Sequence, residues 1–282
     1  MMSLGRRIYS GAVRLMLWAS ASAVCALLLW LSGCVLFRGV PGLSLELLTS
    51  QESVLHGTVG ILPAAVNTLF VIAVTLALVL PLGVGAAVYL SEYAPSRRLA
   101  GAITFAADAL AGLPSILYAM AGVILFCSAL GLQKTLLAGA LTLAVMNLPT
   151  VIRSTQESLR AVPRSCREGA LGLGSGRWHM VRTLVLPASA GGIATGCMLA
   201  VGRVAGESAV LLYTAGLSTA MQDFTSLRGM AGASGATLTT VLYLYAKERA
   251  DFAAAFSVAT VLLALQLAIH LGTALAGRRR RR

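Results

Sequence analysis

The sequence predicts an all-α protein, a polytopic membrane bundle of six transmembrane helices. Of its 282 residues, 57% are hydrophobic and 11% are charged, and the mean hydropathy is +0.83. Soluble domains carry about 25% charged residues, so a water-soluble protein is not expected. The apolar residues also gather in runs that approach or exceed the roughly 20 residues a helix needs to cross a bilayer. Finally, the net charge of +12 is distributed unevenly between the segments that join these runs.

The six predicted spans follow these runs in chain order. They cover about 15–37, 66–90, 105–130, 135–152, 187–213 and 252–276. The third contains Asp108, the fifth contains Arg203 and Glu207, and the other four contain no charged residue. Pro81, Pro114 and Pro149 fall within spans and are expected to bend them, because proline removes a helical hydrogen bond.

Residues 229–246 are also uncharged, but their first half is rich in glycine, serine and threonine. We interpret them as an outer loop or a short re-entrant element. Six spans with an inner N-terminus place 16 of the 22 basic residues inside, and the inner segments then carry +13. The outer loops sum to zero and the spans to −1. A seventh span would place the tail 278–282 outside, against the positive-inside rule. Segment 1–14 and this tail are therefore both expected in the cytoplasm, and 15–277 forms the membrane domain.

The sequence does not favour a nucleic-acid-binding protein, a metalloprotein or a disulfide-rich protein. Nucleic-acid binding needs a basic groove with aromatic platforms, and aromatic residues make up only 6% of this chain. The five cysteines and three histidines are scattered without metal-ligand spacing, so no metal site and no disulfide framework are predicted.

The longest inner segment, 153–186, contains a spaced motif. Glu168-Gly169-Ala170 is followed by Gly174, and after nine further residues by Leu184-x-Leu186-Pro187. This pattern resembles the cytoplasmic EAA loop of ABC importer permeases, with Gly169 in place of the second alanine and Leu184 in place of isoleucine. The resemblance implies a type I importer permease of MetI-like architecture, in which the loop forms a short coupling helix seated on the ATP-hydrolysing subunit.

The resemblance extends over most of the chain and is similar to the PstA family of phosphate-importer permeases. It is carried by Tyr89 to Tyr93, Leu113 to Ile116, Pro149 to Glu157, and the block Arg203-Val-Ala-Gly-Glu-Ser-Ala209. After this block the family continues with proline, where this sequence has Val210. The resemblance implies import of inorganic phosphate. Permeases for molybdate, sulfate or phosphonate, and a membrane-embedded enzyme or sensor, remain alternatives.

Arg203 and Glu207 are the only opposite charges within one predicted span, and they stand at helical i,i+4 spacing. A charge at mid-membrane costs at least about 2.5–3.5 kcal/mol, so it should face the bundle interior. A guanidinium can grip phosphate oxygens with two parallel hydrogen bonds. The pair is therefore either part of a substrate pathway or a structural ion pair, and the resemblance favours the pathway.

The sequence contains no G-x-x-x-x-G-K-[ST] motif, so the chain is expected to be a transporter subunit, not an enzyme, and to bind no cofactor. ATP and magnesium would be used by a partner. By resemblance the partners are a second permease subunit (PstC-like), a dimer of ATP-binding subunits (PstB-like), an extracytoplasmic phosphate-binding protein (PstS-like) and membrane lipid. The expected location is the bacterial inner membrane.

Overall fold

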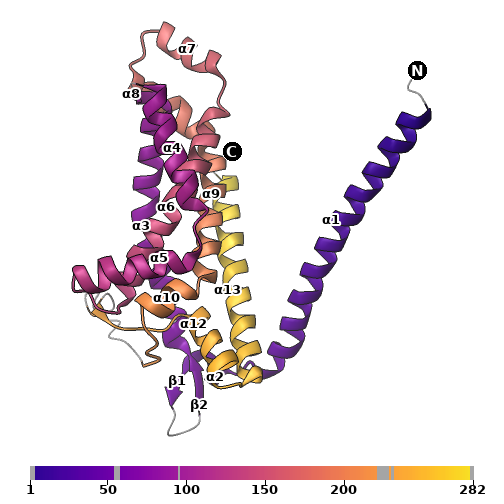
Figure 1. Ribbon diagram of the computed structural model, residues 1–282, viewed down its shortest axis with the longest axis vertical. Helices are drawn as coiled ribbons and strands as arrows, with labels where there is room; N and C mark the ends of the chain where they lie inside the picture. Colours follow the sequence, from indigo (N-terminus) through magenta and orange to yellow (C-terminus); the bar gives the residue numbers. More distant parts are fainter. Residues whose placement is uncertain (1–3, 54–57, 95, 221–228, 230–231, 280–282) are drawn as a thin grey trace.

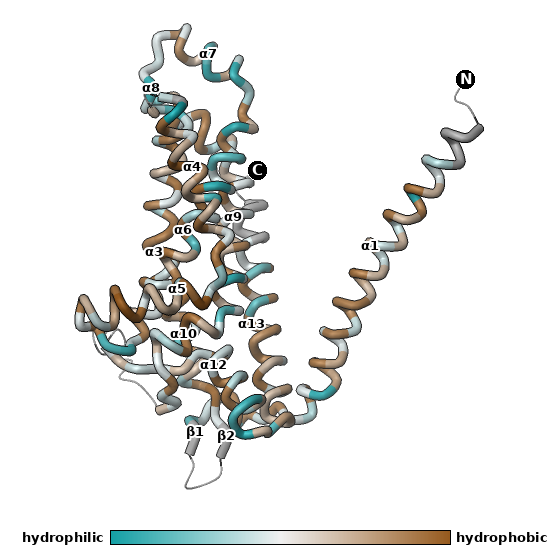
Figure 2. The backbone as a smooth tube through the Cα atoms, in the orientation of Figure 1, coloured by the Kyte–Doolittle hydropathy of each residue, from teal (hydrophilic) through white to brown (hydrophobic). Residues whose placement is uncertain are grey.

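The computed structural model describes all residues except 1–3, 54–57, 95, 221–228, 230–231 and 280–282 (Figure 1). Helices dominate the described chain, which confirms the predicted all-α membrane class. Hydrophobic residues run along the long helices, and hydrophilic residues gather at the two ends of the bundle (Figure 2). Parts of two predicted segments, the end of the tail 278–282 and the beginning of 229–246, lie outside the described residues.

Five helices in the described chain are long and apolar enough to cross a membrane. They are α1 (Leu4–Gly39), α3 (Leu62–Val88), α6 (Leu136–Arg160), α9 (Leu186–Gly206) and α13 (Phe252–Arg279). A pair of shorter helices, α4 (Arg97–Ala111) and α5 (Ser115–Gly122), supplies a sixth span if it is counted as one. Helices α3 and α6 continue through Pro81 and Pro149, so neither proline ends its helix.

The bent pair α4–α5 differs from the single third span that the apolar run predicts. The two helices meet at 99°, and the π-helical segment η3 (Val123–Ala129) continues α5. Pro114 lies at the break, where it disfavours helical backbone at Leu113. The Tyr118 hydroxyl donates to the Leu110 carbonyl at 2.8 Å, and this carbonyl also accepts from the Leu113 N–H at 3.0 Å, so the side chain of α5 ties the end of α4 across the bend.

Helix α6 is the centre of the bundle, and 61% of its most apolar stretch is buried. It lies between α3 and α9 (Figure 1). Two glycines of α9, Gly192 and Gly196, face Ser158 and Ser154 of α6 so closely that a Cβ on either glycine would collide with the serine hydroxyl. Small residues at this spacing let the backbones of two membrane helices approach each other. The α6–α9 contact is therefore set by backbone proximity.

Helix α1 stands away from the bundle (Figure 1), and none of its most apolar stretch is buried within the chain. It is anchored at its C-terminal end on α13. The Thr260 hydroxyl donates to the Val35 carbonyl at 3.2 Å, and the Ser257 hydroxyl donates to the Gly39 carbonyl at 3.3 Å. The rest of α1 is free to contact lipid or another subunit.

The remaining elements are short, and all but one lie at the two ends of the bundle. One end carries η1 (Val40–Gly42), α2 (Leu45–Thr49), α12 (Leu238–Tyr243), η5 (Leu244–Glu248) and an antiparallel hairpin of β1 (Gln51–Ser53) and β2 (Thr58–Ile61). The other end carries η2 (Tyr89–Tyr93), α7 (Arg164–Gly172), α8 (Arg177–Met180) and η4 (Val181–Val185). Helix α10 (Ala209–Thr214) follows α9 inside the bundle.

Candidate functional site

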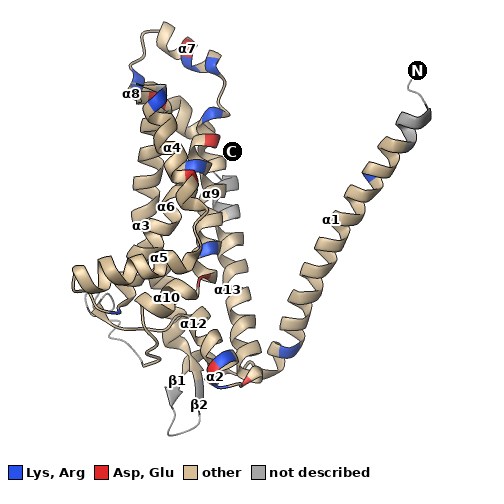
Figure 3. Cartoon of the chain, viewed as in Figure 1, with Lys and Arg blue, Asp and Glu red and all other residues tan. Residues whose placement is uncertain are grey.

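The predicted coupling segment 153–186 forms a projecting end of the molecule. Helix α6 extends to Arg160, so the first eight residues of this segment are helical and continue the span. Pro163 then precedes α7, which lies at the extreme end of the bundle (Figure 1). Basic residues gather on α7 and α8 (Figure 3). The segment therefore presents a short, positively charged helix away from the spans.

The motif residues divide into an outward and an inward set. Glu168 and Gly169 on α7 are exposed. Ala170 is partly buried and packs against the hydrophobic cluster that includes Leu159, Val162 and Met180. Leu184 on η4 and Leu186 at the start of α9 pack against the same cluster, and Pro187 is exposed in the first turn of α9, where proline is favoured. The structure thus brings Ala170, Leu184 and Leu186 together and leaves Glu168 exposed.

Gly174 ends α7 in a way that requires glycine. Its φ is +82°, in the left-handed region. Its N–H donates to the Leu171 carbonyl at 2.9 Å, and the Ser175 N–H donates to the Ala170 carbonyl at 3.1 Å. These two bonds form a Schellman motif, which satisfies the last carbonyls of the helix and turns the chain sharply.

Apolar side chains beside this turn point to solvent. Leu173 is 91% exposed and Trp178 is 61% exposed. Leu171, on the last turn of α7, is also exposed. These exposed apolar groups lie on a basic surface next to Glu168, and exposed apolar patches are typical of interaction sites.

The predicted pair Arg203 and Glu207 does not lie on one continuous helix. Helix α9 ends at Gly206, and Glu207 has extended backbone at φ −82° and ψ 121°. Its Oε1 atom accepts from the N–H groups of Ala209 and Val210 at 3.0 and 3.3 Å, which caps the start of α10. Val210 therefore uses an N–H that the proline of the family pattern lacks. The break explains why i,i+4 spacing does not bring the two charges together.

Arg203 is half-buried at the seam between α6 and α9. Its Nη1 atom lies 3.5 Å from Oγ1 of Thr150 on α6. The ion pairs found among the described residues are Arg153 with Asp108, Arg153 with Glu157, and Arg167 with Glu92, and Arg203 takes part in none of them. Its guanidinium thus keeps most of its hydrogen-bonding capacity for another group.

The structure shows two ion-pair networks whose partners the sequence did not identify. Arg153 joins Asp108 of α4 at 2.7 Å and Glu157 of α6 at 2.9 Å, so Asp108 pairs two helices. Arg167 binds Glu92, 75 residues earlier in the chain. The i,i+4 spacing signalled the Arg153–Glu157 contact, but no local pattern indicated the two long-range partners.

Comparisons with known proteins identify the class. Residues 79–282 match the family model described as "Binding-protein-dependent transport system inner membrane component". The chain belongs to this family. It is a PstA-like ABC permease of the inner membrane, and such permeases are not themselves enzymes.

Relatives at higher identity place the chain within the family. It is 36% identical over 222 residues to the probable ABC transporter permease protein YqgI of Bacillus subtilis, covering 79% of this chain and 76% of that protein. It is 32% identical over 295 residues to the phosphate transport system permease protein PstA 1 of Mycobacterium tuberculosis strain H37Rv, covering 99% and 92%. The phosphate permease PstA of Haemophilus influenzae is 34% identical over 188 residues, covering 67% and 66%.

Solved structures confirm the fold. A chain of the MetNI methionine transporter in an inward-facing conformation matches with a TM-score of 0.60 at 17% identity, covering 79% of this chain and 95% of that chain. A chain of a bacterial importer of alginate matches with a TM-score of 0.61 at 16% identity, covering 97% and 99%. The predicted type I, MetI-like architecture is therefore confirmed.

Proposed function

We propose that this chain is the transmembrane permease subunit of an ATP-driven importer of inorganic phosphate, forming half of the translocation pathway. The observation that carries the proposal is Arg203, a half-buried guanidinium without a carboxylate partner in the described chain, at the seam between two spans. A relative named as a phosphate permease matches over 99% of the chain. A guanidinium fork suits a tetrahedral oxyanion.

Coupling to a separate ATPase would occur through α7. Glu168, in the middle of α7, supplies an exposed acid. Exposed apolar groups come from Leu171 in the last turn of α7, Leu173 just after it and Trp178 on α8. A PstB-like dimer would bind there, use ATP and magnesium, and move the helix. The N-terminal end of α1 and the C-terminal end of α13 lie toward the end of the molecule that carries α7 (Figure 1). The proposal therefore places both ends of the chain in the cytoplasm with the ATPase.

The other partners follow from the unburied surface and the opposite end of the bundle. A PstC-like second permease would complete the pathway and cover part of α1, whose apolar stretch is unburied in this chain. A PstS-like phosphate-binding protein would dock at the end that carries α2 and the β-hairpin. Phosphate would then enter at that end, pass Arg203 and leave at the α7 end.

Uptake of radiolabelled phosphate into cells that carry the complete transporter tests the pathway role. Arg203→Gln removes the charge but keeps a hydrogen-bonding side chain, and we expect a loss of about 1.5–3 kcal/mol, roughly 10- to 150-fold, as for a bond to a charged group. Arg98→Gln, at an exposed arginine of α4 outside the segment 153–186, is the control and should leave uptake unchanged. Wild-type uptake by the Arg203→Gln variant would refute the role of Arg203.

Competition identifies the anion. Excess unlabelled phosphate should abolish uptake, whereas sulfate and molybdate should not. If molybdate, sulfate or phosphonate competes better than phosphate, the chain serves that oxyanion, and the phosphate assignment fails while the permease assignment stands. Glu168→Ala tests coupling separately: it should lower uptake together with binding of the ATPase subunits in pull-down experiments. Unchanged binding and uptake would remove Glu168 from the coupling surface.

A further inference from the structure

Helix α7 has few side chains that face the rest of the molecule. Of its nine residues, only Arg167 and Ala170 are partly buried, and the other seven are exposed. Ala170 contributes a single methyl group to the cluster below it. The noncovalent link between the projecting helix and the spans therefore depends mainly on Arg167.

Arg167 joins three elements at once. Its Nε and Nη2 atoms lie 3.1 and 3.0 Å from Oε1 of Glu92 on η2, the continuation of α3. Its Nη1 atom donates to the carbonyl of Val162, just after α6, at 2.6 Å, and its Nη2 atom donates to the carbonyl of Leu159, in the last turn of α6, at 2.7 Å. The Arg167 and Glu92 side chains are only 17% and 9% exposed. A planar guanidinium is the one side chain whose rigid fork makes all these bonds together.

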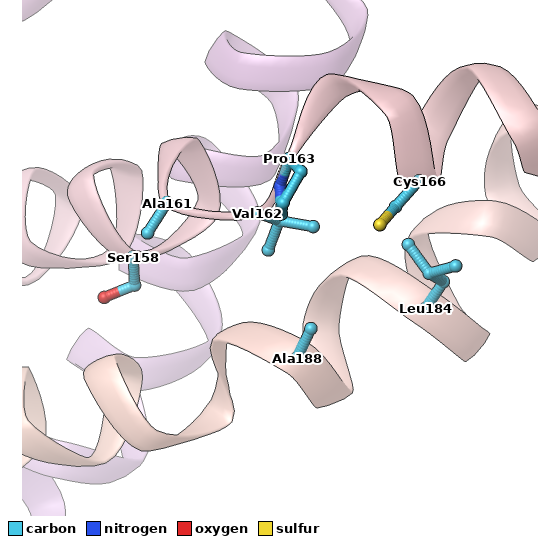
Figure 4. Close-up of a pocket in the computed structure, with 7 residues that line it drawn as sticks. All are labelled: Ser158, Ala161, Val162, Pro163, Cys166, Leu184 and Ala188. Carbon is cyan, nitrogen blue, oxygen red and sulfur yellow. The ribbon is translucent and has the colours of Figure 1, made fainter.

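The neighbouring face of the same turn is not packed. A cavity of about 240 Å³ lies between the first turn of α7, the end of α6 and the beginning of α9 (Figure 4). It is lined by Ser158, Ala161, Val162, Pro163, Cys166, Leu184 and Ala188. The first turn of α7 is thus held firmly toward α3 and α6, and has empty space on the side of α9.

We propose that the Arg167–Glu92 pair is the strut through which movement of α7 reaches α3 and α6. Both residues are positioning residues that act on the spans and touch no substrate. The proposal rests on the proposed function, because it assumes that an ATPase displaces α7. A displacement of α7 is passed by the strut to α3 at η2 and to the end of α6, which pack along each other through the membrane. The cavity lets α7 shift relative to α9 without collision.

The test uses the complete transporter in proteoliposomes, with ATP hydrolysis and phosphate uptake measured in the same vesicles. Arg167→Gln should lower the phosphate moved per ATP hydrolysed by about tenfold, within the range of coupling between sites. ATP hydrolysis and the bound ATPase subunits should stay near wild type. Arg98→Gln is the control, because Arg98 is an exposed arginine on α4, outside the segment 153–186, and it should leave the ratio unchanged. An unchanged transport ratio in Arg167→Gln would overturn the proposal.

A double-mutant cycle protects the test against simple misfolding. Glu92→Gln keeps an oxygen acceptor for Arg167 and should fold even if Arg167→Gln assembles poorly. If the two residues act as one strut, Glu92→Gln combined with Arg167→Gln loses no more coupling than Arg167→Gln alone. If the fold-loss of coupling in the double variant equals the product of the losses in the two single variants, the residues act independently, and the strut is overturned. Glu92→Ala removes the acceptor altogether, so unaffected coupling in a folded Glu92→Ala variant would overturn the partnership of Arg167 with Glu92 at the end of α3.

The same measurements distinguish failure of the strut proposal from failure of the phosphate assignment. If the wild-type complex hydrolyses ATP but moves no phosphate, the phosphate assignment fails. The ratio is then measured with molybdate, sulfate or phosphonate, whichever competes in uptake. A tenfold lower ratio in Arg167→Gln supports the strut with any of these anions, and an unchanged ratio refutes it.

Discussion

The glycine that ends α7 offers the sharpest test of the coupling segment. Gly174 has φ +82° and closes the Schellman motif through its N–H and that of Ser175. The variant Gly174→Ala places a Cβ in the left-handed region, which costs about 1–2 kcal/mol for an L-residue. No atom lies within 4 Å of the added Cβ, so the cost comes from backbone conformation and not from a collision.

Gly169→Ala is a matched control on the same helix. Gly169 lies inside α7, has helical backbone, and would also place its Cβ in open space. Alanine in a helix interior is favoured over glycine by about 0.5–1 kcal/mol. The same substitution, five residues apart, should therefore destabilise α7 at one position and stabilise it at the other.

Hydrogen exchange of the α7 amides in the purified complex measures both effects. Gly174→Ala should speed exchange at Gly174 and Ser175 and over the last turn by roughly 5- to 30-fold, the ratio that 1–2 kcal/mol produces. Gly169→Ala should slow exchange in the same helix. The reasoning is refuted if Gly174→Ala leaves exchange unchanged, or if the two variants shift it in the same direction.

Three further predictions concern the spans. Gly196→Leu should separate α6 from α9, because even a Cβ collides with Ser154, and should cost about 1–3 kcal/mol as a lower midpoint of unfolding in mixed micelles; an unchanged midpoint would refute the close contact. Tyr118→Phe removes the hydrogen bond to the Leu110 carbonyl and should cost about 0.5–1.5 kcal/mol in the same assay, and a more stable variant would count against this bond. Glu207→Gln keeps the oxygen that caps α10, whereas Glu207→Ala removes it. If Glu207 acts as a cap, uptake stays near wild type in Glu207→Gln and is lost in Glu207→Ala. Equal loss of uptake in both variants would show that the charge is needed.

The sequence was sufficient where the physics is local. Charge-free runs located α1, α3, α6 and α13, because burial in lipid acts on each run separately. The motif spacing placed a glycine at position 174, and Gly174 has the left-handed conformation that favours glycine. The roles of Arg203 and of the motif residues stay predictions until they are measured.

The sequence was insufficient where distant residues decide the structure. The run 105–130 looked like one span, but the angle at Pro114 depends on how α5 packs, with Tyr118 reaching back to Leu110. The i,i+4 spacing of Arg203 and Glu207 assumed one helix, and Glu207 ends that helix by capping the next. Arg167 gave no sign of its partner, because Glu92 meets it only after α3 and α6 have packed side by side.

The anchoring of α1 has a consequence for how the protein is made. The bonds that hold its end, Thr260 to Val35 and Ser257 to Gly39, join residues 225 and 218 positions apart. Ribosomes add about 5–20 residues per second, so α1 enters the membrane roughly 10–40 s before its anchor on α13 exists. During that interval lipid, insertion factors or a partner subunit must accompany it. Helix α1 therefore reaches its place late, and a nascent chain that stops before α13 lacks the hydrogen bonds that attach α1 to α13.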